Sequence, residues 1–150
     1  MIKIAITGKE KVAEPNAYAA LVEFYAAFNE GNMALMEKNW SNTENTAMDN
    51  PLGGIKRGWE EIRQVYENIF NGKAEVYVEY YDYTLHEFGE IFYTVCRERG
   101  FFKVDGQSIA LAIRTSRIYK KELGSWKQCH HHGSIENPEL LKTYQDLVRK

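Results

Sequence analysis

The stretch "QSIALAIRTSRIYKKELGSWKQCHHHGSI", residues 107–135, indicates two long β-strands joined by a tight turn. Bulky and small side chains alternate through its first half, and the letters "ELG" separate it from the second half. A period of two over this length is typical of strands with one buried face, and a short Gly-containing break is typical of a hairpin. This hairpin predicts a sheet as the main element of the fold.

Two more strand-like segments precede this hairpin. They are "AEVYVEYYDYTLHEF" at 74–88 and "EIFYTVCRERGFF" at 90–102, and the short breaks "FGE" and "VDG" follow them. Strands connected by such short loops are neighbours in an antiparallel sheet. The second half of the chain therefore predicts a four-stranded antiparallel meander.

Helical patterns occupy the first half. Apolar residues recur at helical spacing in 16–32, in a short segment capped by Asn32, and in 59–72, where Gly72 is the expected stop. The turn formers in 43–58 predict a loop, and Asn137-Pro138 opens a last short helix. Helices followed by strands predict one α+β domain over 1–150, with three N-terminal helices packed on a strongly curved antiparallel sheet and a short C-terminal helix.

Composition narrows the class of protein. Hydrophobic residues make up 44% and charged residues 27% of the chain, as in soluble globular proteins. A net charge of −2 without a basic run gives no reason to expect a nucleic-acid partner. No stretch of 18 apolar residues and no signal-peptide pattern is present, so we expect no membrane partner and a cytoplasmic location. Ten Tyr, seven Phe and three Trp favour a large pocket or a buried interface.

The strand at 107–119 shows which face lies inside. One face carries the bulkier set, Ile109, Leu111, Ile113, Thr115, Arg117 and Tyr119. The opposite face carries small side chains such as Ser108, Ala110 and Ala112, which are not polar enough for a face left in water. We expect the bulky face to meet the helices and a second copy of the chain to cover the other face, giving a homodimer.

The length of the "ELG" turn sets the orientation of the histidine run. A three-residue turn with Gly124 in the left-handed conformation predicts the pairs Lys121–Ser125, Arg117–Cys129 and Thr115–His131. Cys129 and His131 then point inward, and His130 and His132 point outward. Cys96 and Cys129 lie on strands that are not neighbours, so we expect no disulfide between them.

The helix order, the "DNPLGG" loop and the final "WKQCHHHGS" strand resemble the NTF2-like superfamily, also described as SnoaL-like or cystatin-like α+β proteins. The resemblance extends over nearly the whole chain. It implies a cone-shaped sheet that encloses a cavity, and members that form dimers or larger assemblies. Ketosteroid isomerases, polyketide cyclases, dehydratases and the association domain of calmodulin-dependent kinase share this fold, so the resemblance does not identify one function.

The ketosteroid isomerase branch can be compared residue by residue. The resemblance places its catalytic aspartate at Asn50, next to Asp49, and its oxyanion-hole tyrosine at Phe24, next to Tyr25. A further acid would fall near Ser116. An amide does not accept a proton at neutral pH, so the resemblance implies the isomerase scaffold without the catalytic groups of that branch.

The kinase association domain fits the second half of the chain better. Two of its pocket arginines align with Arg97 and Arg117, and its pocket tryptophan aligns with Phe70. A pocket histidine and a third arginine fall on Ile62 and Gly133, which cannot replace them. The resemblance implies a pocket that favours a carboxylate or another small anion.

The candidate ligand-binding residues are therefore Arg97, Arg117, His131, Tyr25, Asn50 and Phe70. For the arginines, the alternative is an ion pair with Glu98, Glu79 or Asp49. If "DG" at 105–106 is a two-residue turn, Arg97 lies on the outer face, and only a bulge would bring it inside.

The histidine run has three interpretations. His130 and His132 are close enough on a strand to chelate a metal, but the sequence places no third ligand beside them, so we expect no metal and no other cofactor. His131 is the candidate catalytic base, because an inward imidazole near Arg117 can titrate near neutral pH. The alternative is that all three are wall and interface residues.

The sequence therefore predicts a domain that binds a small-molecule ligand. One alternative is an enzyme of the isomerase, cyclase or dehydratase type with His131 as its base. The other is an oligomerisation module.

Overall fold

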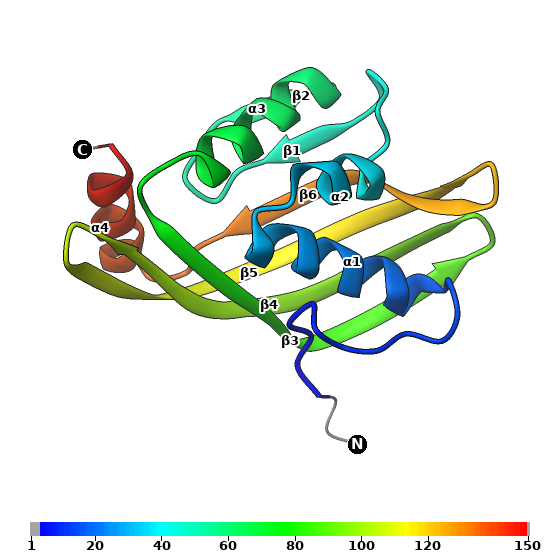
Figure 1. The fold of residues 1–150 in the computed structure, drawn as a ribbon, viewed down its shortest axis with the longest axis horizontal. Helices are drawn as coiled ribbons and strands as arrows, with labels where there is room; N and C mark the ends of the chain where they lie inside the picture. The colour runs from blue at the N-terminus through cyan, green and yellow to red at the C-terminus, as the bar shows by residue number, and fades with distance from the viewer. Residues whose placement is uncertain (1–3, 150) are drawn as a thin grey trace.

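The computed structural model describes residues 4–149, which form an α+β cone of four helices and one six-stranded curved sheet (Figure 1). The helices are α1 (Ala17–Glu30), α2 (Met33–Asn39), α3 (Trp59–Phe70) and α4 (Pro138–Val148). The strands are β1 (Ala47–Asp49), β2 (Ile55–Arg57), β3 (Glu75–Phe88), β4 (Ile91–Val104), β5 (Gln107–Glu122) and β6 (Ser125–Ser134). Residues 1–3 of the segment inspected for a signal peptide lie outside the described range.

The helix ends follow the expected capping chemistry. The Asn32 side chain accepts a hydrogen bond from the first turn of α2, and Asn137 does the same for α4. Gly31 ends α1 in the left-handed conformation, with φ of 64°, which a residue without Cβ adopts at little cost. The third helix ends at Phe70, two residues before the expected stop at Gly72.

The segment 43–58, predicted as a loop, contains the two short strands β1 and β2. They form a hairpin around the expected Asn50–Gly54 turn, and β1 pairs with β6 in parallel. The six-stranded sheet, with the order β2-β1-β6-β5-β4-β3, is therefore mixed and not purely antiparallel as predicted. Strands of three residues are too short to show a period of two, so the sequence pattern did not reveal them.

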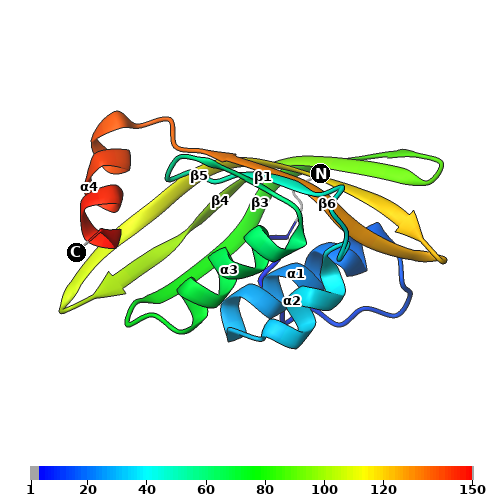
Figure 2. The same cartoon turned by 90° about the horizontal axis from the view of Figure 1, so that it is seen from above.

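The helices α1, α2 and α3 lie against one face of the sheet, while α4 stands at one end (Figure 2). The inner face of β5 is the predicted one, because Leu111, Ile113, Thr115, Arg117 and Tyr119 are all buried. The opposite small residues are exposed in the isolated chain, and their coverage by a second copy stays a prediction. No helix among residues 4–149 is long and apolar enough to cross a membrane.

The β5–β6 hairpin has a different register from the predicted one. Its turn holds two residues, Leu123 and Gly124, both with positive φ, so all three predicted residue pairs are wrong. A register shift between Ile118 and Tyr119 leaves Cys129 without a partner on β5, as in a β-bulge. Arg117 consequently pairs with His131.

Because of the bulge, one side chain of β6 lies on a different face from the predicted one, while the predicted faces of His131 and His132 are correct. His131 points inward and His132 is exposed, as expected. Cys129 does not share the inner face, because its Sγ donates to the carbonyl of Ile118 instead. Cys96 and Cys129 are both free thiols, in agreement with the expectation that they form no disulfide.

Candidate functional site

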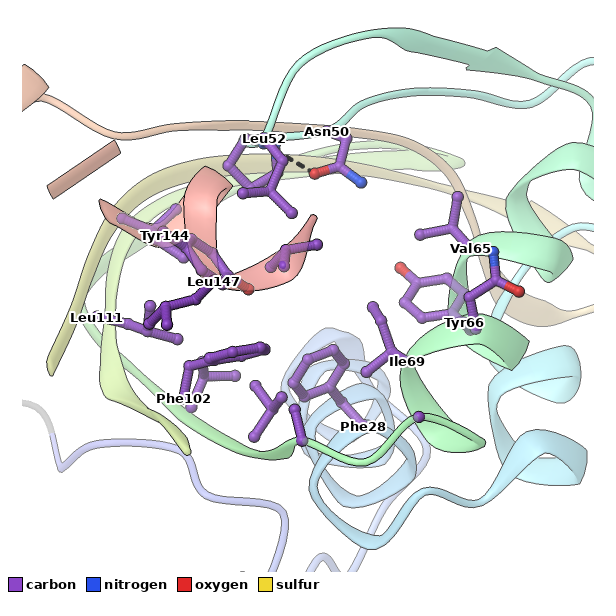
Figure 3. A pocket seen from close by; sticks show the side chains of 18 of the residues that line it. Phe28, Asn50, Leu52, Val65, Tyr66, Ile69, Phe102, Leu111, Tyr144 and Leu147 are labelled. Atoms are coloured by element: carbon purple, nitrogen blue, oxygen red, sulfur yellow. Dashed lines mark hydrogen bonds between the residues drawn. The ribbon is translucent and has the colours of Figure 1, made fainter. Parts of the chain in front are cut away.

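A cavity of about 730 Å³ lies between α3, α4 and the concave face of the sheet (Figure 3). Its wall is mainly apolar, and the contributing side chains include Phe28, Leu52, Val65, Ile69, Val76, Phe102, Leu111, Ile113 and Leu147. Cavities of several hundred Å³ with apolar walls and few polar groups are typical small-molecule sites. The volume and the lining therefore suit an organic molecule of modest size.

The helix α4 and the β1–β2 turn lie on neighbouring sides of this cavity. The Tyr144 ring packs edge-on against Phe102, with the ring centroids 5.1 Å apart. Gln145 Nε2 donates to the Leu52 carbonyl at 2.9 Å. Asn50, which lines the cavity as predicted, accepts a hydrogen bond from the Leu52 amide and so holds the turn. These contacts attach the last helix to the cavity wall.

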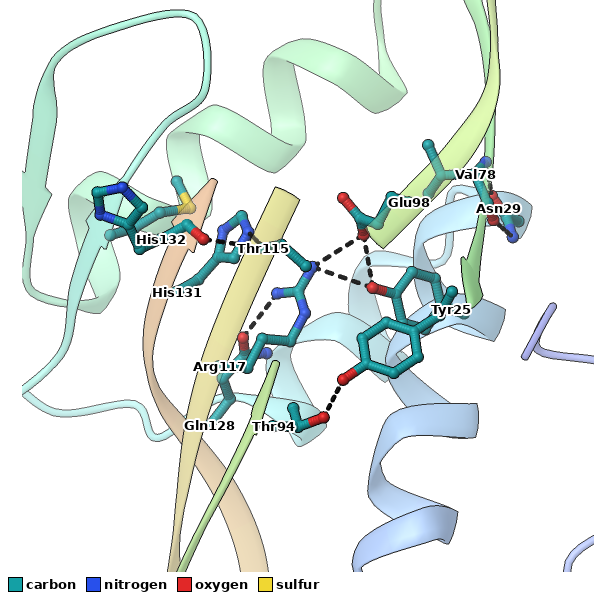
Figure 4. Close-up of polar contacts among 12 residues, drawn as sticks. Tyr25, Asn29, Val78, Thr94, Glu98, Thr115, Arg117, Gln128, His131 and His132 are labelled. Carbon is teal, nitrogen blue, oxygen red and sulfur yellow. Dashed lines mark hydrogen bonds and ion pairs between the residues drawn. The ribbon is translucent and has the colours of Figure 1, made fainter. Parts of the chain in front are cut away.

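The floor of the cavity carries a buried ion pair. Arg117 Nη2 lies 3.3 Å from Glu98 Oε2, and the two side chains are 2% and 7% exposed. The Tyr25 hydroxyl donates to the same Glu98 oxygen at 2.5 Å, and Arg117 Nη1 donates to Gln128 Oε1 at 2.7 Å (Figure 4). The guanidinium also lies 3.7 Å from the centre of the Phe24 ring, which attracts a cation.

These contacts keep Arg117 charged. Burial works to lower the pKa of its guanidinium, but the neighbouring Tyr25 and Glu98 outweigh burial and raise it above the ordinary value. For Tyr25, burial raises the pKa well above its usual range, so the phenol stays protonated and remains a donor to Glu98. Within the ion pair the charge of Arg117 is balanced by Glu98.

His131 also lines the cavity, and its hydrogen bonds define its tautomer. The Thr115 hydroxyl donates to the His132 carbonyl at 3.0 Å, so it accepts from His131 Nε2 at 2.6 Å. The lone pair then remains on Nδ1, a buried atom with no partner among the described residues. Burial, and next the positive charge of Arg117, lower the pKa of His131 well below its ordinary value. The ring is therefore neutral at physiological pH.

The structure brings together three of the six predicted ligand-binding residues. Arg117, His131 and Asn50 line the cavity. Tyr25 is fully buried behind the floor, where it contacts Glu98 rather than the cavity. It acts by orienting the ion pair.

Phe70 and Arg97 do not line the cavity, contrary to the prediction. Phe70 turns toward α1, where its ring packs against Phe28. Arg97 lies on the outer face, because Asp105 and Gly106 form a two-residue turn and the β4–β5 register runs without a bulge. Its guanidinium bonds Glu136 at 2.7 Å.

Glu98 is the main site residue that the sequence analysis missed. We considered it only as an ion-pair partner, although it alternates with Cys96 and Phe102 on the inner face of β4. A single acid on an otherwise apolar strand face is the signal that could have identified it. Tyr66, on α3, also lies on the cavity wall and was not among the predicted site residues.

The outer histidines contact the β1 strand. His130 Nδ1 lies 3.0 Å from the Ala47 carbonyl, and His132 Nδ1 lies 2.6 Å from Asp49 Oδ2. Across residues 4–149 there is no group of three or more His, Cys, Asp or Glu side chains that could hold a metal ion. These two histidines help to attach β1 to β6.

Solved structures with this fold come from proteins of several kinds. A candidate calcium/calmodulin-dependent protein kinase type II association domain from Thiobacillus denitrificans is 21% identical, with a TM-score of 0.67, over 85% of this chain and 100% of that chain. A candidate dehydratase of the NTF2-like family from Streptomyces avermitilis is 16% identical, with a TM-score of 0.69, over 80% and 94%. A ketosteroid isomerase-like protein from Erwinia carotovora is 17% identical, with a TM-score of 0.66, over 81% and 94%. At these identities the likeness shows the fold alone.

Family membership comes from the sequence itself. A search of curated proteins gives no match to this chain. The family model described as SnoaL-like domain matches residues 18–138, which include nearly all of α1, the helices α2 and α3 and all six strands. The chain therefore belongs to the SnoaL-like domain family and has the NTF2-like α+β fold.

Proposed function

We propose that this protein binds a small, largely apolar organic molecule, with the polar end of the ligand on the cavity floor. The observation that carries this proposal is the cavity of about 730 Å³, whose apolar wall ends in the buried Arg117–Glu98 pair and His131. Burying the apolar part of such a ligand provides affinity at about 25 cal/mol per Å², and the polar groups provide orientation.

The anion preference expected from the sequence has less support. Arg97 lies outside the cavity, and the charge of Arg117 is balanced by Glu98. A carboxylate on the floor would meet the negative charge of Glu98 beside a cation, Arg117, that is already paired with it. We therefore propose that an uncharged ligand binds more tightly than the carboxylate of the same shape.

Calorimetry with simple two-ring aromatic probes tests this proposal. A variant with Ile69→Trp places extra bulk in the cavity, because Ile69 points into it (Figure 3). Val12→Trp, at a position 37% exposed, is the matched control outside the cavity. We expect a naphthyl compound to bind the natural chain and the Val12 variant but not the Ile69 variant. Equal binding to all three chains would show that the cavity is not the site.

A catalytic role for His131 is the second candidate function. The neutral ring keeps a lone pair on a buried Nδ1, and a base of this kind can remove a proton next to a carbonyl group. Relatives of the same fold include proteins described as a dehydratase and as ketosteroid isomerase-like. The test is exchange of the α-protons of a bound ketone in deuterated water, with a loss of about a hundredfold or more expected for His131→Asn. Unchanged exchange in that variant would exclude His131 as the base.

Self-association through the outer sheet face remains a proposal. One solved structure with this fold is described as the CaMKII hub of S. rosetta, and another as the CaMKII hub homology domain of Chlamydomonas. The exposed row Ser108, Ala110 and Ala112 offers small side chains over which a second sheet could pack. We expect a homodimer by light scattering, and Ala112→Glu should convert it to a monomer. A monomer of the natural chain would contradict the proposal.

A further inference from the structure

The floor of the cavity holds one carboxylate oxygen without a donor. Both hydrogen bonds to Glu98, from Tyr25 and from Arg117, reach Oε2. No group among the described residues donates to Oε1, and Figure 4 shows this oxygen turned away from the guanidinium. Glu98 lines the cavity, so a ligand can reach it. A carboxylate oxygen in a mainly apolar cavity is poorly solvated unless it accepts a hydrogen bond.

A second acceptor on the same floor is also without a donor. His131 donates through Nε2 to Thr115, which leaves the lone pair of Nδ1 unused. The ring cannot offer a proton in its place, because burial and the Arg117 charge keep it neutral. The carboxylate oxygen therefore requires a donor from outside the chain, whereas the ring nitrogen is buried and can accept from a ligand only if the side chains around it move.

Donors that could meet a ligand acceptor are also available. Tyr66 lines the cavity, and its hydroxyl donates a weak hydrogen bond to Met48 Sδ at 3.9 Å, while the Trp40 and Arg117 side chains lie close enough to donate to the same oxygen. Burial raises the pKa of Tyr66 to about 12, so the phenol keeps its proton. The floor thus offers both acceptors and donors.

Only some polar groups match this arrangement. A carboxylate, an ether or a ketone accepts hydrogen bonds but cannot donate one to Glu98 or His131. An ammonium group donates but cannot accept from Tyr66. A hydroxyl group does both.

We propose that the ligand of this cavity is an alcohol or a phenol, whose hydroxyl donates to Glu98 or His131 and accepts from Tyr66. The inference rests on the proposed function, since it names the chemical class of the molecule that the cavity binds. A site of this kind differs from an anion-binding site, because its floor prefers a ligand group that donates a hydrogen bond over one that only accepts.

Four probes with the same ring system test the inference by calorimetry on the full chain. They are a naphthol, its methyl ether, the naphthyl methyl ketone and the naphthoate. We expect the naphthol to bind at least about tenfold more tightly than the other three probes. One hydrogen bond to a charged or buried acceptor contributes an affinity difference of this size. An ether or a ketone that binds as tightly as the naphthol would overturn the hydroxyl inference and leave the proposed function standing. Absence of binding by all four would overturn both.

Two variants assign the acceptor. In Glu98→Gln the amide oxygen accepts from Tyr25 and an NH2 group replaces the free Oε1, and His131→Phe removes the ring nitrogen but retains a ring of similar size. At least one of them should lower the preference for naphthol over ether to about twofold or less. Val65→Ala, in the apolar wall, is the matched control, because it should weaken both probes equally and leave their ratio unchanged. A preference retained in both acceptor variants, each checked for native circular dichroism, would contradict the proposal.

Discussion

Removal of the Glu98 charge should destabilise the protein far more than its small change in shape suggests. In Glu98→Gln the amide oxygen can still accept from Tyr25, but Arg117 loses its counter-charge while its side chain is only 2% exposed. Breaking a buried ion pair by removing one partner costs about 3–5 kcal/mol, because the remaining charge has neither bulk water nor a counter-charge. For a chain of this size we expect the melting temperature to fall by roughly 6–20 °C.

A double-mutant cycle separates the ion pair from ordinary packing. Arg117→Met alone leaves the Glu98 charge buried and should cost a similar free energy of unfolding. The double variant, Glu98→Gln with Arg117→Met, leaves no buried charge and should cost less than the sum of the two single variants by about 1–3 kcal/mol. Urea unfolding followed by far-ultraviolet circular dichroism measures all four free energies.

An exposed pair provides the control. Arg99 lies 2.6 Å from Glu79, but its side chain is 54% exposed. Solvent screens this pair, so Arg99→Gln should change the free energy of unfolding by no more than about 1 kcal/mol. The reasoning would be refuted if Glu98→Gln cost no more than this control, or if the costs of the single variants were additive in the double variant.

Three further predictions concern stability and thiol reactivity. In the folded chain, burial depresses the pKa of His131 and the ring is neutral, whereas in the unfolded chain the ring gains a proton below about pH 6.5. The contribution of His131 to stability is therefore complete above about pH 6.5. It is lost as the pH falls below that value, by up to about 1.4 kcal/mol per pH unit. In His131→Phe this part of the pH dependence should disappear, and an unchanged slope in urea titrations would contradict the assignment. Gly100→Ala should lower the free energy of unfolding by about 1–3 kcal/mol, because a Cβ there would meet the Tyr77 carbonyl oxygen at 1.8 Å across the β3–β4 pair. A melting temperature equal to that of the natural chain would argue against this close approach. Burial raises the pKa of the Cys96 thiol, so a disulfide reagent should modify it only in urea and after Cys129, and rapid labelling of Cys96 in the folded chain would show that its strand opens.

Local chemistry was enough to predict most of the elements. The helix caps at Asn32 and Asn137, the left-handed Gly31 and the four long strands depend on residues within a few positions of one another. The inner face of β5 could also be predicted, since alternation of side chains between the two faces is a property of each strand alone. The resemblance drawn from these elements led to the family and the fold that the comparisons show.

The composition of the cavity floor depended on contacts between distant segments. Glu98 and Arg117 lie 19 positions apart, and Tyr25 lies 73 positions from Glu98. The sequence predicted that Arg117 faces inward, but a strand pattern does not reveal which inward charges meet or whether they neutralise each other. The anion site expected from two arginines therefore became a balanced ion pair with one arginine, because Arg97 followed the uninterrupted β4 register to the outer face.

The sequence by itself determined the helices, the four long strands and the buried strand face, because these follow from periodicity, capping and turn chemistry close along the chain, and its resemblance to known proteins indicated the family. Only the tertiary structure decided the β5–β6 register, the parallel β1–β6 pair and the partners of Arg117 and His131. The physical reason is that a one-residue bulge at Cys129 and a turn one residue shorter than predicted shift the β5–β6 pairing without leaving a distinctive pattern in the sequence.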